Sequence, residues 1–242
     1  NFIYVSTMLM AVYWLSIFVL IILAYYGAYL YNLKYDRLAG FRTWVMGVSV
    51  LMMLAVGFFF TNSLLIMTDP KVWPTYFDRP AGTLIHFGEP NLIPRYLHFV
   101  VSSVAMGGLA VGLLGWWRTR RGDAESGTTM TRGLRIYAFS TLFNFVVGVL
   151  YLGTLPNQVL EKAAFGNTAA MVVFVISITT ALCSVLYGMS GSPWHTAVTA
   201  VATIFFMVLF RYAVQSAYLE TYLSAVKPEV VHQLGPLALF IA

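Results

Sequence analysis

Six apolar stretches, each about twenty residues long, constrain this chain more than any other feature of its sequence. A helix of about 20 apolar residues is long enough to cross the hydrocarbon core of a bilayer. Only 10% of the 242 residues are charged and 60% are hydrophobic, whereas soluble domains are about 25% charged. We therefore expect an all-α, polytopic transmembrane helix bundle with six full spans and the start of a seventh. The expected spans are residues 2–30, 43–67, 94–117, 136–155, 168–189 and 196–218, and the seventh begins near Pro236.

Basic residues are distributed unevenly over the expected loops. Residues 118–135 hold five arginines, and Lys34, Arg37 and Arg42 lie on the same side, whereas the proline-rich loop 68–93 has mixed charge. Because basic loops stay in the cytoplasm, the arginine-rich loop is expected on the cytoplasmic side. The expected membrane is a bacterial inner (cytoplasmic) membrane. The net charge of +5 is then an orientation signal, and no nucleic-acid partner is expected.

The chain is expected to form one integral membrane domain over residues 1–242, without a disulfide framework, because it has a single cysteine. It starts at Asn1 instead of a methionine and stops inside an apolar run after Leu237. We therefore expect it to be a piece of a longer subunit.

His98 is the first candidate functional residue. Pro94 suits the first turn of a helix, and His98 then lies about one turn inside an expected span. An ionisable side chain at that depth is costly without a partner, so it marks a functional site by default. The alternative is a histidine that forms a hydrogen bond at the membrane interface.

Met171 is expected at the same depth as His98. Asn167 is a predicted N-cap, and the spans 94–117 and 168–189 both begin on the outer side. His98 and Met171 each lie four residues after the start of their helix, about 6 Å inside. Such a pair would ligate a haem iron axially, an arrangement that raises its potential. The alternative for Met171 is ordinary packing.

Arg211 is the other costly residue inside a span. Met207, Arg211 and Gln215 share one helix face because they are spaced four apart. Arg211 is expected to pair with haem propionates or with an acidic group, or else to extend its charge to the interface. Met207 is a rival axial ligand to Met171.

Two further features of the spans have a packing interpretation. Asn144 is expected to form an interhelical hydrogen bond. The small residues that follow His98 indicate either close helix packing or room for a flat macrocycle. They are Ser102, Ser103, Ala105, Gly107, Gly108 and Gly112.

Three segments of the chain resemble subunit I of the cytochrome bd quinol oxidases. They are "FFFTNSLLIMTDP", "NLIPRYLHFVVSSVAMGGLAVGLLGWW" and "YAFSTLFNFVVGVLYLG". The resemblance implies that His98 is the axial histidine of a low-spin haem b and that Met171 is its axial methionine. The first two helices of that family are absent, and its quinol-binding loop is reduced to about residues 156–167. The chain therefore resembles a bd-like haem-b subunit without the oxygen-reducing site.

The expected function is that of a membrane electron-transfer subunit in an oxidoreductase complex of a respiratory chain, not an oxygen reductase by itself. Its b-type haem near the outer face would pass electrons between quinone or inner partners and periplasmic redox proteins such as c-type cytochromes. The expected partners are therefore the lipid bilayer and other subunits of a redox complex. One alternative is a haem-free membrane anchor or scaffold. Another is a transporter in which Arg211 and Gln215 bind an anionic solute, although no inverted repeat is present to favour it.

Overall fold

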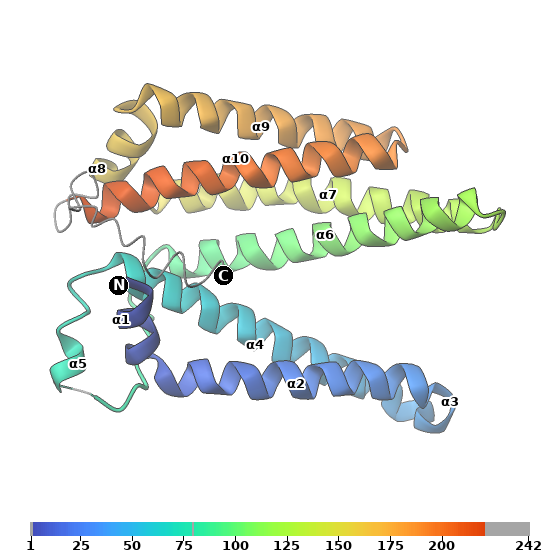
Figure 1. The fold of residues 1–242 in the computed structure, drawn as a ribbon, viewed down its shortest axis with the longest axis horizontal. Helices are drawn as coiled ribbons and strands as arrows, with labels where there is room; N and C mark the ends of the chain where they lie inside the picture. The colour runs from blue at the N-terminus through green and yellow to red at the C-terminus, as the bar shows by residue number, and fades with distance from the viewer. Residues whose placement is uncertain (1, 79, 221–242) are drawn as a thin grey trace, which may run out of the picture.

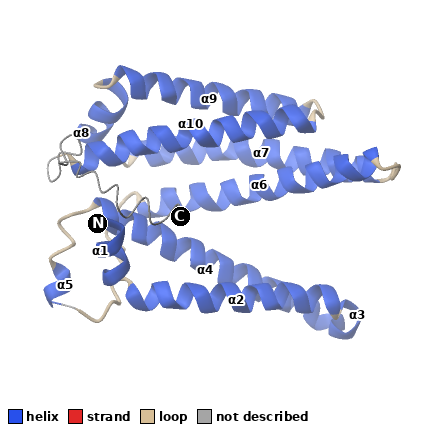
Figure 2. Cartoon of the chain, viewed as in Figure 1, coloured by secondary structure: helices blue, strands red, loops and turns tan. Residues whose placement is uncertain are grey.

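The computed structural model describes residues 2–78 and 80–220, which form helices joined by turns and loops, with no strand (Figures 1 and 2). Six of these helices are long and apolar enough to cross a membrane. The predicted all-α bundle and its six spans are thereby confirmed, while the predicted start of a seventh span near Pro236 lies outside the described residues. The six are α2 (Ala11–Leu33), α4 (Arg42–Thr68), α6 (Leu92–Arg120), α7 (Ser126–Gly153), α9 (Thr168–Met189) and α10 (Pro193–Leu219).

Short helical segments connect the long helices at both ends of the bundle. Lys162 of one of them forms an ion pair of 2.6 Å with Glu220, at the end of α10. The short helices are α1 (Phe2–Leu9), α3 (Tyr35–Leu38), α5 (Thr75–Asp78), α8 (Asn157–Leu160), the 3-10 turn η1 (Ala39–Phe41) and the π-helical turn η2 (Glu161–Phe165).

The long helices form three neighbouring antiparallel pairs, α2 with α4, α6 with α7, and α9 with α10 (Figure 1). We call the end with residues 69–91 the loop end, and the opposite end, with the turn at residues 121–125, the arginine end. Helix α4 lies against α6 near the loop end and diverges from it toward the arginine end (Figure 1). Where α4 and α6 are in contact, the Tyr96 hydroxyl donates a hydrogen bond of 2.9 Å to the carbonyl oxygen of Leu54.

The α6–α7 pair is the most extensively packed in the described part of the chain. Its helices approach closely because glycines face each other: a Cβ on Gly108 would lie 2.8 Å from the Tyr137 nitrogen and 2.9 Å from the Gly133 oxygen. Gly112 likewise packs directly on Leu134. Small residues at a membrane helix interface allow this close backbone contact, so packing accounts for Gly108 and Gly112.

The first predicted helix, residues 2–30, is wrong as a single element, because the structure interrupts it at Met10 between α1 and α2. The loop before α6 supplies hydrogen bonds at the break. The Val12 N–H donates to the Gly82 oxygen over 3.1 Å, and the Leu84 N–H donates to the Leu9 oxygen over 3.0 Å. A neighbouring segment therefore satisfies backbone groups that an unbroken helix would pair internally.

The predicted span 136–155 starts too late, because α7 already begins at Ser126. Arg132 and Arg135, expected in a loop, are therefore helical, and the turn between α6 and α7 contains only residues 121–125. Hydropathy marks the part of a helix that lies in hydrocarbon, whereas α7 continues beyond that part with polar residues. The other predicted spans end within a few residues of the observed helices.

Candidate functional site

His98 lies on the side of α6 that faces α7. Helix α6 begins at Leu92, so Pro94 occupies its first turn as predicted, and His98 lies six residues after Leu92, about 9 Å along the axis. A Cβ on Gly148 would stand 3.9 Å from both Cε1 and Nδ1 of His98. The imidazole thus rests on α7 where that helix has no side chain.

The two nitrogens of His98 have different surroundings. Nδ1 is enclosed and has no hydrogen-bond partner within residues 2–78 and 80–220, whereas Nε2 is not enclosed in this way. An enclosed polar atom without a partner costs about 1–3 kcal/mol, and in native proteins it marks a place where water, an ion or a ligand is bound. Nε2, which is not among the enclosed atoms, is then the nitrogen of His98 that a ligand would reach.

One turn farther along, a hydrogen bond between side chains crosses the same interface. Asn144 Nδ2 donates a hydrogen bond of 2.8 Å to Ser102 Oγ, which confirms the predicted interhelical role of Asn144. Asn144 Oδ1 is enclosed and, like His98 Nδ1, has no partner among the residues described. The two orphaned atoms lie on successive turns of one interface.

Arg95 lies one turn before His98, toward the loop end. Its Nη2 donates a hydrogen bond of 2.7 Å to the Tyr151 hydroxyl, and its guanidinium lies 5.2 Å from the centroid of the Tyr151 ring. Arg95 is also near enough to Arg211 for their charges to repel. Neither arginine forms an ion pair with an acidic side chain in the part of the chain that the structure describes.

Arg211 lies level with His98 along the bundle. Asn91 Nδ2 donates a hydrogen bond of 3.2 Å to the Tyr218 hydroxyl, and this bond joins α6 to α10. The two helices are antiparallel (Figure 1), so seven residues from Asn91 lead to His98 and seven back from Tyr218 lead to Arg211. Two cationic side chains, Arg95 and Arg211, and the histidine therefore lie near the loop end of α6 and α10.

The structure places Met171 apart from this group. Asn167 caps α9 by accepting a hydrogen bond of 3.2 Å from the Ala170 N–H, as predicted, and Met171 on the first turn is 44% exposed. Helix α9 packs on α10 and α7 and makes no extensive contact with α6. The structure therefore does not pack the helices of His98 and Met171 against each other, and their joint ligation of a haem stays a prediction.

Met207 lies on α10, a helix that does pack against α6. It is half-buried and precedes Arg211 by four residues, so it lies about 6 Å nearer the arginine end than His98 does. Its role as a rival ligand also stays a prediction.

Arg211 and Gln215 line a cleft of about 560 Å³ between α10 and the helices α1, α2 and α4. The opposite wall carries Ser63, whose Oγ accepts a hydrogen bond of 3.3 Å from Trp14 Nε1. The remaining lining is largely apolar, with Phe60, Leu64, Met67 and Val208 among its members. Apolar walls with few polar groups are typical of small-molecule sites.

The pairing of His98 with Gly148 was missed at the level of sequence. His98 and Gly148 lie at equal sequence distances from Asp123, as do Arg95 and Tyr151. If a tight turn at Asp123 had been expected, both pairs could have been predicted from these equal distances. The sequence instead indicated a long loop over residues 118–135, which does not define the register of the two helices.

Comparisons of the chain with protein-family models, with curated proteins and with solved structures find no match.

Proposed function

We propose that this chain is a membrane electron-transfer subunit that holds a b-type haem through His98. The observation that carries the proposal is the environment of the His98 imidazole, with Nδ1 enclosed against Gly148 and Nε2 left accessible. Imidazole nitrogen is a common axial ligand of haem iron, and a histidine inside a membrane span needs a partner to offset its cost.

In this proposal, His98 and two arginines would hold the haem. Nε2 of His98 would bind the iron, while packing of the ring on α7 fixes its orientation. Arg95 and Arg211, which have no acidic partner among the described side chains, would offset the charge of the haem propionates. The haem itself would supply reversible one-electron transfer. Met171 is the proposed second ligand of the haem, and Met207 is the alternative to it.

The further parts of the proposal concern the path of the electrons. The subunit would work with other subunits of an oxidoreductase complex in a bacterial inner membrane and exchange electrons with periplasmic proteins, such as c-type cytochromes. Quinone would be the partner within the membrane. The cleft that Gln215 lines supports this last step, because its amide N–H groups are suited to a carbonyl oxygen of a quinone and the apolar lining to its ring and tail.

A reduced-minus-oxidised absorption spectrum of the purified chain tests the haem. We expect a b-type signal in the wild type, its loss in His98→Ala, and its retention in His195→Ala. His195 is a suitable control because it lies on the first turn of α10 at the arginine end, where its Nδ1 is 2.7 Å from Ser192 Oγ. With a quinol as reductant, slower haem reduction in Gln215→Leu is expected if the cleft binds the quinone.

Two outcomes would contradict the proposal. A wild-type chain without a b-type signal would favour the alternative function, a haem-free scaffold that anchors redox partners. A signal that survives His98→Ala would assign the iron to another ligand. Thermal unfolding of both alanine variants separates loss of the haem from loss of the fold.

A further inference from the structure

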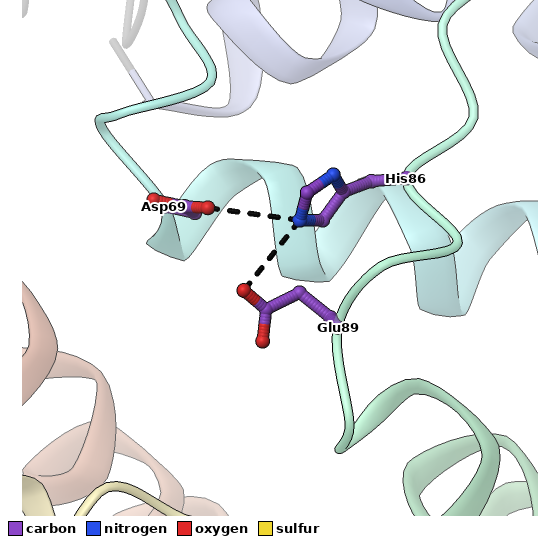
Figure 3. A group of neighbouring side chains, drawn as sticks. All are labelled: Asp69, His86 and Glu89. Atoms are coloured by element: carbon purple, nitrogen blue, oxygen red, sulfur yellow. Dashed lines mark ion pairs between the residues drawn. The ribbon is translucent and has the colours of Figure 1, made fainter.

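Three side chains with metal-binding atoms converge at the loop end of the bundle (Figure 3). His86 Nε2 lies 3.7 Å from Asp69 Oδ2 and 3.5 Å from Glu89 Oε1, and all three atoms lie within 4.8 Å of one another. Asp69 follows the last residue of α4, whereas His86 and Glu89 belong to the loop that precedes α6. The cluster therefore connects segments that are adjacent in space and separated in sequence.

His86 is held in place by a buried side chain of α4. Asn62 is 0% exposed, and its Nδ2 donates a hydrogen bond of 3.1 Å to the His86 oxygen while its Oδ1 accepts one of 3.0 Å from the His86 N–H. Both backbone polar groups of His86 are thus fixed by one amide. The backbone that carries the imidazole is therefore held against α4.

Local hydrogen bonds also position the Asp69 carboxylate and the backbone of Glu89. Asp69 Oδ1 accepts from the Lys71 N–H over 3.2 Å, so Oδ2 is left to face His86. The carbonyl oxygen of Glu89 accepts from the Leu92 N–H over 3.1 Å at the start of α6. The side chains of Asp69 and Glu89 both point at the same imidazole edge (Figure 3).

The distances distinguish two interpretations of this cluster. A hydrogen bond from Nε2–H to oxygen would measure about 2.7–3.2 Å, and Nε2 is in fact enclosed without a hydrogen-bond partner among the residues described. Ligands about 2.0–2.1 Å from a tetrahedral ion are separated from one another by roughly 3.3 Å. The separations of 3.5 and 3.7 Å are close to that edge length and longer than a hydrogen bond.

Charge favours the same interpretation. The two carboxylates carry two negative charges, which one divalent cation would neutralise. A nitrogen ligand favours zinc-like transition metals over Mg²⁺ and Ca²⁺. We propose that Asp69, His86 and Glu89 bind one divalent transition-metal ion of the zinc class, which ties the end of α4 to the start of α6. This site is independent of the proposed haem.

Zinc binding by the full-length chain in detergent tests the proposal. After treatment with a chelator, Zn²⁺ is titrated in competition with a chromophoric chelator. We expect one Zn²⁺ per chain, and an affinity lower by about tenfold or more in each of Asp69→Asn, His86→Gln and Glu89→Gln. The control Asp78→Asn changes an exposed carboxylate of the same loop, and His195→Gln changes a histidine at the arginine end. Both controls are expected to bind like the wild type.

A second measurement reads zinc binding as a change in thermal stability. Zn²⁺ should raise the unfolding temperature of the wild type and of Asp78→Asn but leave that of Glu89→Gln unchanged. A wild-type chain that binds no zinc at micromolar metal overturns the proposal, as does unchanged affinity in the three ligand variants. Either result would make the cluster an ion pair between His86 and its carboxylates.

Discussion

Asp123 is held by hydrogen bonds and a nearby positive charge in the turn between α6 and α7. It lies at the centre of the turn between α6 and α7, and its Oδ2 accepts a hydrogen bond of 2.6 Å from the Ser126 hydroxyl. The Ser126 hydroxyl, together with the N–H groups of Ser126 and Glu125 and the charge of Arg118, holds the pKa of Asp123 below its usual range. The register that brings His98 onto Gly148 is centred on this residue.

The lowered pKa of Asp123 predicts a pH dependence of stability. A depressed pKa in the folded state means that the carboxylate stabilises the fold above its unfolded pKa, about 3.9, and that this contribution is lost as the pH falls through the folded pKa. We expect Asp123→Asn to unfold at a lower temperature than the wild type at neutral pH, with the gap closing in acid. Thermal unfolding of both proteins as a function of pH measures this gap, and a gap that stays constant with pH would contradict the mechanism.

At the scale of helices, the α6–α7 pair depends on glycines in specific positions. A Cβ on Gly108 would meet the backbone of Tyr137 and Gly133, whereas a Cβ on Gly107, its neighbour on the same helix, would have nothing within 4 Å. The two adjacent glycines therefore separate the effect of helix packing from the effect of helix propensity.

Alanine substitutions at these two positions should have different effects. Gly108→Ala is expected to destabilise the bundle by about 1–3 kcal/mol, because the added methyl group forces the two helices apart. Gly107→Ala is expected to leave stability unchanged or to raise it by up to about 1 kcal/mol, since alanine is the better helix former. Denaturant unfolding in detergent micelles, followed by circular dichroism, compares the two variants. Equal stabilities would show that Gly108 does not hold the interface together.

The six spans were predictable because the length of an apolar run depends only on local sequence. The break at Met10 was not, because its hydrogen bonds come from Gly82 and Leu84, more than seventy residues away. His98 could be selected because an ionisable residue in a span is unusual by itself. Its contact with Gly148 could not, since that contact depends on where α7 begins, and polar residues beyond the apolar run hid this start.

At the scale of the whole molecule, the two ends of the bundle differ in chemistry. At the arginine end, the guanidinium of Arg121 lies 3.8 Å from the centroid of the Trp117 ring, and that of Arg120 lies 4.5 Å from the Trp116 ring. Aromatic and basic side chains are typical of the interface between membrane and water. The loop end instead carries the Asp69–His86–Glu89 cluster. Of these features, only the basic residues are the basis of the proposed orientation, with the arginine end in the cytoplasm.

Labelling of single cysteines tests this orientation directly. In a Cys183→Ser background, Ala81→Cys places a thiol in the loop 69–91 and Ala124→Cys places one in the turn 121–125; both alanines are exposed and lie outside the long helices. Because basic segments are retained in the cytoplasm, a membrane-impermeant maleimide should label Ala81→Cys in intact cells and Ala124→Cys only after permeabilisation. The reverse pattern would put the arginine end outside and the proposed haem and zinc sites near the cytoplasmic face. Labelling of the matched variants after solubilisation gives the full signal against which each is compared.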